Sequence, residues 1–459
     1  MRIYNTLSRG KEELTPLEPG RVRIYSCGPT VYKYAHIGNF RTYVFADVLC
    51  RALEYLGCEV TQVMNITDVG HLTDDQFDRG EDKMLVSARL ENRSAEEIAE
   101  FYAQAFLDDA AKLNVRRAAH YPRATEYVPR MQELIQRLIE RNHAYAVDGT
   151  VYYDIASFPE YGKLSRNSPQ QLLAGARGEP DPRKRNPGDF TLWRAAGQNR
   201  AQVWDSPWGP GFPGWHIECS AMSTALLGER FDVHTGGRDN IFPHHEAEIA
   251  QSEGAFGHRV VGCWMHGDFL MLSGTRMAKS AGNFLRVAEL EEQGFDPLAF
   301  RYLTLQARYR RKLDFSPDLL AGADRALRQL RERIAEWRAG PDGPRGDHEQ
   351  RFREAIADDL DLPAAMALVA QVGRSDLAPG ARAALLLDWD RVLGLGLDRV
   401  PAPAQLPAGA AELLDRRQRS RAAKDYATSD RLRSELAAMG VVVTDSPEGQ
   451  RWTVAARTP

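Results

Sequence analysis

The sequence predicts an α/β protein with a parallel sheet, followed by a helical region and a small α+β unit at the C-terminus. Three observations support this fold class. A strand–loop–helix–strand succession fills residues 21–64, a helical and basic pattern covers 296–338, and a helical run with a closing hairpin ends the chain. Because such a βαβ unit implies parallel strands, ligands are expected at the carboxyl ends of the strands.

The first unit follows from hydrophobic periodicity. Residues 21–26 (RVRIYS) alternate apolar and polar side chains, as a half-buried strand does. Over residues 39–56 apolar side chains recur at helical spacing, and Gly57 follows where a left-handed cap is favoured. Residues 59–64 (EVTQVM) predict the second strand. This arrangement places Cys27 and the loop after it at the ligand-binding edge.

The rest of the chain divides by regularity and composition. Residues 113–204 are less regular, with a helical stretch at 128–141, and are interpreted as an insertion into the sheet domain. In the tail, one helical run at 411–439 closes at Gly440, and strands at 441–444 and 451–454 are expected to pair through a turn. The predicted domains are a sheet domain (1–112 and 205–295), the insertion (113–204), a helical region (296–400) and a C-terminal unit (409–459), with linker-like stretches at 339–347 and 401–411.

Composition limits the class of protein. The 459 residues are 43% hydrophobic and 27% charged, which excludes a disordered or collagen-like chain. No apolar stretch approaches the ~20 residues that cross a bilayer, and the start does not resemble a signal peptide. Five scattered cysteines do not form a disulfide framework. We therefore expect a cytoplasmic protein with no membrane partner, and its net charge of −4 gives no global attraction to polyanions.

Two short motifs favour phosphate binding. The segment His36-Ile37-Gly38-Asn39 lies at the start of the helix that follows the first strand. Free backbone N–H groups at a helix start attract anions. Far downstream, the small and basic segment 274–280 contains Lys279, whose charge could meet a leaving phosphate. Taken singly, the first motif is also explained by capping and packing, and the second by a solvated loop.

Together, and in this order, the two motifs resemble the "HIGH" and "KMSKS" signatures of class I aminoacyl-tRNA synthetases. The resemblance implies catalytic roles for His36, Asn39 and Lys279, and ATP binding by these residues and Gly38. The sequence departs from the signatures at Asn39, Arg276 and Ala278, which replace His, Lys and Ser. His36 and Lys279 are intact.

A candidate metal site lies between these motifs. His244 and Glu248 are four residues apart on a predicted helix, so they share a face and can bind one ion. Cys219 stands in the segment 214–222, and zinc accepts sulfur, nitrogen and oxygen ligands. The spacing alone is equally explained by packing or an ion pair, and it does not connect Cys27 to this set.

A closer resemblance makes that connection. Residues 27–32 (CGPTVY), 65–68 (NITD), 214–222 and 242–252 are similar to the cysteinyl-tRNA synthetase family. The resemblance implies one zinc ion per chain, bound by Cys27, Cys219, His244 and Glu248, with the thiolate of the substrate cysteine on the same ion. It further implies that Gly28, Thr67 and Trp215 line the cysteine pocket and that Asp239 holds the ATP ribose. Trp215 as an ordinary core residue is the alternative, and Cys50, Cys58 and Cys263 are expected to be structural.

Such a site explains how cysteine is selected. A soft thiolate is a far better zinc ligand than a serine hydroxyl of similar shape, whereas a hydrophobic pocket separates such isosteres by only ~10²-fold. Zinc also lowers the pKa of a bound thiol. We therefore expect no separate editing domain. Because four protein ligands usually close a site, either a fifth ligand is added or Glu248 is held weakly.

RNA-binding regions are expected in the C-terminal half. Residues 300–340 carry a net charge of +5 and residues 409–459 of +2, although basic helix faces are often only solvated surface. Their placement resembles the stem-contact and anticodon-binding regions of the family. Trp452 either stacks on an anticodon base or anchors the hairpin. The candidate tRNA-binding residues are Arg310, Arg311, Arg416, Arg421 and Trp452.

The resemblance implies a Rossmann-like catalytic domain with a connective insertion, a stem-contact and helical bundle domain, and an anticodon-binding domain. Its implied reaction is ATP-dependent activation of L-cysteine and transfer to the 3′-terminal adenosine of tRNA(Cys), with Mg²⁺ accompanying ATP and the enzyme acting as a monomer. One alternative is the related ligase that joins cysteine to an amino-sugar in mycothiol synthesis, which should not need the C-terminal unit. The other, a non-catalytic RNA-binding paralogue, does not explain the intact His36, Lys279 and zinc ligands.

Overall fold

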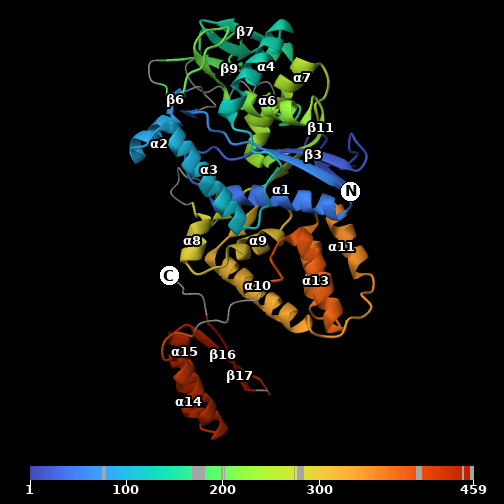
Figure 1. The fold of residues 1–459 in the computed structure, drawn as a ribbon, viewed down its shortest axis with the longest axis vertical. Helices are drawn as coiled ribbons and strands as arrows, with labels where there is room; N and C mark the ends of the chain where they lie inside the picture. Colours follow the sequence, from blue (N-terminus) through green and yellow to red (C-terminus); the bar gives the residue numbers. More distant parts are fainter. Residues whose placement is uncertain are drawn as a thin grey trace.

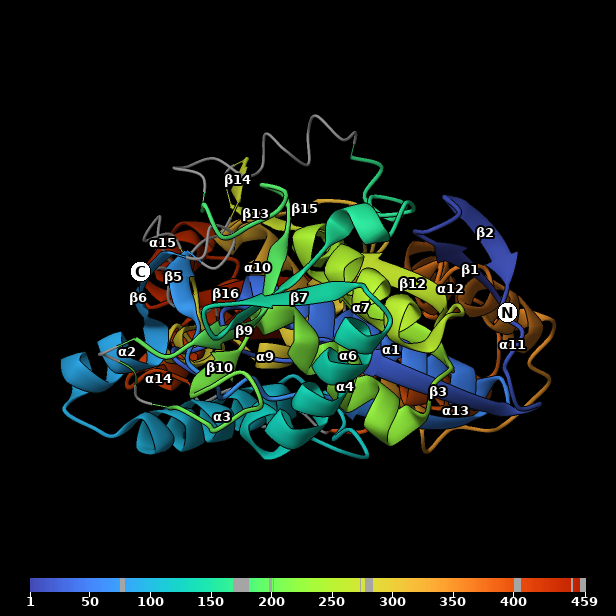
Figure 2. The same cartoon turned by 90° about the horizontal axis from the view of Figure 1, so that it is seen from above.

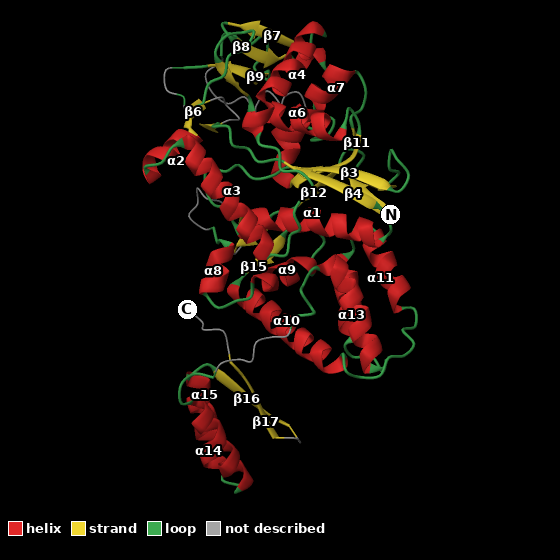
Figure 3. Cartoon of the chain, viewed as in Figure 1, coloured by secondary structure: helices red, strands yellow, loops and turns green. Residues whose placement is uncertain are grey.

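A four-stranded parallel sheet lies at the centre of the protein, with strand order β12–β11–β3–β4. The structure is a computed structural model that describes residues 1–74, 79–167, 181–197, 200, 202–272, 274–276, 284–399, 406–446 and 449–454. Figure 3 shows α1 on one face of this sheet and α6 on the other, which confirms the predicted α/β class. The elements of this core are β3 (Arg21–Ser26), α1 (Ile37–Tyr55), β4 (Glu59–Met64), α6 (Trp215–Leu227), β11 (Phe231–Gly237), α7 (Glu246–Phe256) and β12 (Val261–Gly267).

The first βαβ unit is confirmed, and β3 and β4 have the limits that their sequence pattern predicts. Helix α1 begins two residues before the predicted Asn39 because His36 caps it. Gly57 adopts a φ of 101°, as expected for the residue that ends the helix. Helix α1 is buried along most of its length, so it fixes the position of its N-terminus relative to the sheet edge.

An antiparallel sheet of order β10–β9–β8–β7 and helix α4 form a second layer beyond α6. Strand β10 belongs to this sheet although it lies after residue 204. Figure 2, seen from the end that carries this sheet, shows its strands in front of α6 and α1. The elements here are β5 (Leu72–Asp74), β6 (Arg79–Asp82), α2 (Lys83–Glu91), α3 (Ala95–Lys112), α4 (Val128–Glu140), β7 (Ala144–Val147), β8 (Thr150–Tyr153), β9 (Phe190–Ala195) and β10 (Gly211–Pro213), with the terminal hairpin β1 (Arg2–Asn5) and β2 (Gly10–Glu13) at the other sheet's edge.

Helices α8–α13 pack beneath α1 (Figure 1). A buried ion pair joins the two layers: Arg301 Nη2 lies 2.6 Å from Asp47 Oδ2 of α1. Arg331 is also buried and bonded within this layer, so part of the +5 charge of residues 300–340 is not a surface feature. The elements are β13 (Leu270–Leu272), β14 (Thr275–Arg276), α8 (Val287–Glu292), α9 (Pro297–Leu305), β15 (Leu313–Phe315), α10 (Pro317–Trp337), α11 (His348–Ala357), α12 (Leu362–Val372) and α13 (Pro379–Leu393).

The C-terminal unit forms its own small core (Figure 1). The prediction of one helical run over 411–439 is wrong, because the run is broken at Lys424, whose φ is 62°, and Asp425 caps a second helix. The predicted hairpin is confirmed. Among the described residues, none of the helices combines the length and the apolar character that a bilayer crossing requires. The elements are α14 (Ala410–Ala422), α15 (Tyr426–Ala438), β16 (Val441–Ser446) and β17 (Gly449–Val454).

Candidate active site

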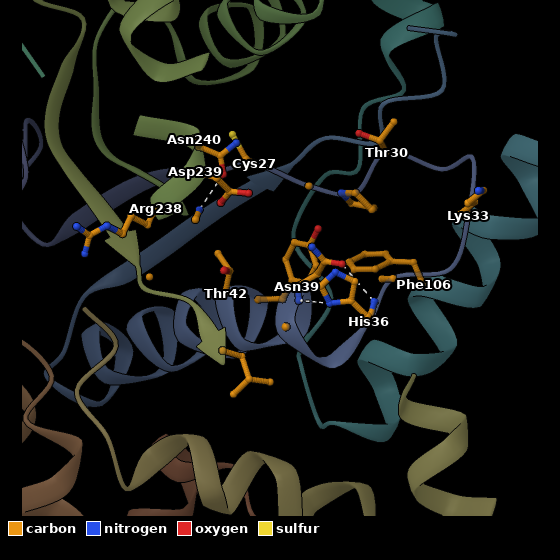
Figure 4. Close-up of a pocket in the computed structure, with 18 of the residues that line it drawn as sticks. Cys27, Thr30, Lys33, His36, Asn39, Thr42, Phe106, Arg238, Asp239 and Asn240 are labelled. Atoms are coloured by element: carbon orange, nitrogen blue, oxygen red, sulfur yellow. Dashed lines mark hydrogen bonds between the residues drawn. The ribbon is translucent and has the colours of Figure 1, made fainter. Parts of the chain in front are cut away.

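A cavity of about 440 Å³ opens at the carboxyl ends of the central strands. It is walled by the loop after β3, by the residues that follow β11 and β12, and by the start of α1. Figure 4 shows His36 and Asn39 on α1 facing this space, with Cys27 and Asp239 on the sheet side. The predicted residues that line it are Cys27, Gly28, His36, Gly38, Asn39, Trp215 and Asp239.

The start of α1 carries a reciprocal cap. The backbone N–H of Asn39 donates to His36 Nδ1 at 3.3 Å. In return, the backbone N–H of His36 donates to the side-chain oxygen Oδ1 of Asn39 at 3.2 Å. The capping explanation therefore holds, and it also orients both side chains at the cavity. The positive end of a helix of 19 residues faces the same space, which suits a polyphosphate.

Position 28 requires glycine because the backbone of Asn65 approaches it too closely for a side chain. Its amide N–H donates to Asn65 Oδ1 at 2.9 Å, and a Cβ at this position would lie 1.7 Å from the Asn65 carbonyl oxygen. Thr67 stands behind this wall and is not among the residues that line the cavity; its hydroxyl donates to Glu218 Oε2 at 2.8 Å. Its contact with cysteine stays a prediction.

Four predicted metal ligands converge although they are far apart in the sequence. One donor atom each from Cys27, Cys219, His244 and Glu248 lies within 4.8 Å of all the others. Cys219 and Glu248 come from the adjacent helices α6 and α7, and Cys27 from the end of β3. This set of sulfur, nitrogen and oxygen donors could bind a metal and suits zinc.

Without a cation, burial favours the neutral forms of all four cluster residues, because it also raises the pKa of Glu248. Burial raises the pKa of the Cys27 thiol, and a hydrogen bond with Cys27 followed by burial raises that of Cys219. Burial lowers the pKa of His244, so its ring is neutral and can be a ligand. Glu248 Oε1 is buried, has no hydrogen bond to the described residues and lies 3.1 Å from His244 Nε2. A dication would satisfy this oxygen and stabilise the thiolates.

The sequence analysis missed a histidine cluster around these ligands. His234 and His245 form a second possible set with Cys27 and Glu248. However, His245 Nε2 is 3.1 Å from Cys27 Sγ and its Nδ1 is 2.7 Å from His266 Nε2, while His234 Nε2 is 2.8 Å from Glu248 Oε2. His244 Nε2 contacts Glu248 in the same way, at 3.1 Å, so these contacts do not decide between the two donor sets. The adjacent His244–His245 pair was the available sequence signal.

Trp215 is a cavity residue rather than an ordinary core residue. It is only partly buried, lines the cavity, and its ring centroid lies 4.4 Å from that of His244. His216 Nδ1, 2.9 Å from His244 Nδ1, holds the other side of that imidazole. Such supporting contacts orient a metal-binding histidine.

The predicted tRNA-binding residues are not among those that line this cavity. Lys279, with residues 277–283, is outside the described residues. Arg310 pairs with Asp359 at 2.7 Å, while Arg311 is exposed. In the C-terminal unit Arg416 is exposed, Arg421 pairs with Asp445 at 3.0 Å, and Trp452 is half-buried against the small core, as an anchor of the hairpin would be.

These features define a class I aminoacyl-tRNA synthetase catalytic domain. Residues 13–325 match the family described as the tRNA synthetases class I (C) catalytic domain, and residues 404–452 match the cysteinyl-tRNA ligase anticodon binding domain. The fold is similar to that of a Mycobacterium tuberculosis methionyl-tRNA synthetase bound by methionyl-adenylate, with a TM-score of 0.57 and 14% identity over 83% of this chain and 93% of that one.

Curated relatives narrow the class to one family. The chain is 45% identical to a cysteine–tRNA ligase 1 of Burkholderia lata (98% of this chain, 96% of the relative). It is 44% identical to the cysteine–tRNA ligase of Thermus thermophilus (98% and 98%) and 41% identical to that of Treponema denticola (98% and 99%). The chain belongs to the cysteine–tRNA ligase family, and cysteine–tRNA ligase activity is its function.

Proposed function

We propose that this enzyme activates L-cysteine with ATP in the 440 Å³ cavity and then transfers the cysteinyl group to the 3′-terminal adenosine of tRNA(Cys). The observation that carries the proposal is that a four-donor metal cluster and a phosphate-binding helix start open into the same cavity, through Cys27 and His36. Cysteine and ATP can therefore be held side by side, and positioning supplies much of the rate enhancement in such a site.

The phosphates of ATP, accompanied by Mg²⁺, would lie at the start of α1. There His36 and Asn39 donate hydrogen bonds and the helix end contributes positive charge. Asp239, at the other side of the cavity, would accept hydrogen bonds from the ribose hydroxyls. Lys279 would add charge stabilisation for the departing pyrophosphate.

Cys27, Cys219, His244 and Glu248 would hold one zinc ion per chain at the floor of the cavity. Zinc, when bound, supplies a soft Lewis acid that prefers a thiolate to a hydroxyl. Trp215 and Gly28 would shape the space around the substrate side chain, since both line the cavity beside Cys27. Discrimination against serine would then be complete at the binding step, without an editing domain.

The C-terminal unit favours tRNA over an amino-sugar as the acceptor. Its match to an anticodon-binding domain over residues 404–452 supports anticodon contact by the predicted unit 409–459, and stem contact is assigned to 296–400. We expect a cytoplasmic monomer, and the five free thiols suit a reducing compartment.

Cobalt substitution tests the selection of cysteine. The visible spectrum of the cobalt-loaded enzyme should change on adding L-cysteine and stay constant on adding L-serine. An unchanged spectrum with cysteine would refute direct metal–thiolate recognition. In parallel, the enzyme should charge tRNA(Cys) and leave an amino-sugar acceptor unmodified; the reverse acceptor preference would favour the mycothiol-type ligase.

A further inference from the structure

Glu218 is a fully buried residue that is not among those lining the active-site cavity. It lies on α6, one residue before Cys219. Its two carboxyl oxygens face different partners: Oε2 accepts a hydrogen bond from the Thr67 hydroxyl at 2.8 Å, and Oε1 lies 2.5 Å from His71 Nε2. Burying a carboxyl group costs free energy unless it is bonded in this way, so the three side chains form one unit.

Thr67 connects this unit to the loop that walls the active-site cavity. Its backbone N–H donates to the carbonyl oxygen of Pro29 at 3.0 Å, and its own carbonyl oxygen accepts from the backbone N–H of Val31 at 3.1 Å. Pro29 and Val31 line the cavity, as does Thr30 between them, which Figure 4 labels on this loop. The position of Thr67 therefore sets the position of the loop.

Asn65 makes a second connection to the same wall. Its Nδ2 donates to Thr67 Oγ1 at 3.0 Å, and its Oδ1 accepts from the backbone N–H of Gly28 at 2.9 Å. Because the Thr67 hydroxyl accepts from Asn65 and donates to Glu218, the direction of its hydrogen is fixed. This chain of hydrogen bonds ends at Gly28, next to the metal donor Cys27 in the cavity wall.

His71 is itself held by residues of the insertion. The backbone N–H of its neighbour Gly70 donates to Gln202 Oε1 at 2.9 Å, and Gln202 Nε2 donates to the carbonyl oxygen of Asp68 at 3.1 Å. Arg200 donates to the carbonyl oxygen of Gly70 as well. Since His71 is also buried, it gives Glu218 a fixed support on the side away from Thr67.

We infer that His71 and Glu218 are positioning residues of the cysteine site. They hold Thr67, and through it the wall formed by residues 28–31, in the conformation that binds L-cysteine. The inference rests on the proposed function, in which cysteine binds beside Cys27. The ATP phosphates are placed at the start of α1, outside this wall, so loosening the wall weakens the binding of cysteine more than that of ATP. A purely structural role would affect both substrates alike.

Steady-state ATP–pyrophosphate exchange by the full chain tests this inference. In His71→Leu the Glu218 carboxylate loses one partner, so the KM for cysteine should rise about 10-fold, while kcat and the KM for ATP should stay within about 2-fold. His71→Asn is too short to reach Glu218 and should have the same effect, which keeps the test decisive where the leucine variant does not fold. His71→Gln, whose amide can replace the Nε2 contact, should retain most of the cysteine affinity.

A double-mutant cycle shows whether His71 acts through Thr67. Thr67→Val removes the hydroxyl that donates to Glu218 and keeps a similar shape. In that background His71→Leu should change the KM for cysteine by less than about 2-fold, because the connection is already broken. Independent effects that multiply in the double variant would overturn the inference.

The controls separate positioning from metal binding and folding. Zinc content should stay near one per chain, since neither substituted residue belongs to the donor cluster. His143→Leu is the matched control: its Nδ1 lies 2.9 Å from Ser157 Oγ in the insertion, away from the lining of the cavity, and neither KM should change. An equal rise in both KM values, loss of zinc, or an unchanged KM for cysteine in the His71 variants would each contradict the inference. Absence of cysteine-dependent exchange in the unmodified enzyme would instead overturn the proposed function.

Discussion

The guanidinium of Arg41 donates a hydrogen bond to the backbone carbonyl oxygen of Asp268 at 2.9 Å. Arg41 lies on α1, five residues after His36, and Asp268 follows β12 in the wall of the active-site cavity. The same guanidinium donates to the carbonyl oxygens of Phe269, Arg308 and Arg311. One buried side chain therefore fixes α1 to the cavity wall and to the basic segment 308–311.

Replacing Arg41 should affect both folding and activation. Arg41→Met leaves buried carbonyl oxygens without donors, so the free energy of unfolding should fall by about 2–4 kcal/mol. ATP–pyrophosphate exchange should also fall, because the cavity wall loses its attachment to α1. Denaturant unfolding and exchange assays measure the two effects. Arg41→Lys should be intermediate, and an Arg41→Met variant as stable as the parent would contradict this role.

The sequence predicted the local elements better than the interactions between them. The limits of β3 and β4 follow from a period-two pattern that each strand carries by itself. By contrast, nothing local distinguishes Arg301, which is buried against Asp47, from the exposed Arg311. Charge counts therefore overestimated the basic surface.

The candidate site shows the same limit. Cys27 and Cys219 are brought together only by the tertiary fold. Their place in one metal-binding set was therefore predicted from a family resemblance and could not be deduced from their spacing in the sequence. The break at Lys424 was missed because the helical pattern is otherwise continuous across it. The one local signal is Asp425, which caps the second helix.

His36→Asn separates capping from phosphate binding. Asparagine is a good N-cap residue and can still accept from the Asn39 amide N–H, so the melting temperature should stay within about 2 °C. The imidazole is lost, and ATP–pyrophosphate exchange should fall by about 10²-fold if His36 stabilises the transferring phosphate. His36→Ala should lose both properties. Parallel loss of stability and activity in His36→Asn would show that His36 acts through the cap alone.

Asp109 should make stability dependent on pH. Burial raises the pKa of this α3 carboxyl to about 6, with a smaller contribution from Glu291. Because the folded state holds this proton more tightly than the unfolded state, its contribution favours folding below pH 4 and is lost as the pH rises through 6. Asp109→Asn, which mimics the protonated form, should raise the melting temperature at pH 8 and leave it unchanged at pH 4. An equal rise at both values would point to a different cause.

Metal analysis of cysteine variants tests which donor set holds the ion. Cys219→Ser replaces a soft ligand with a poor one, so zinc content after dialysis should fall from about one per chain to near zero. Stability should fall with it, because metal binding contributes to the free energy of folding. Cys58→Ser is the matched control, since Cys58 lies after α1 and away from the cluster. Full zinc content in Cys219→Ser, together with its loss in His234→Ala, would move the ion to the overlapping set of Cys27, His234, His245 and Glu248.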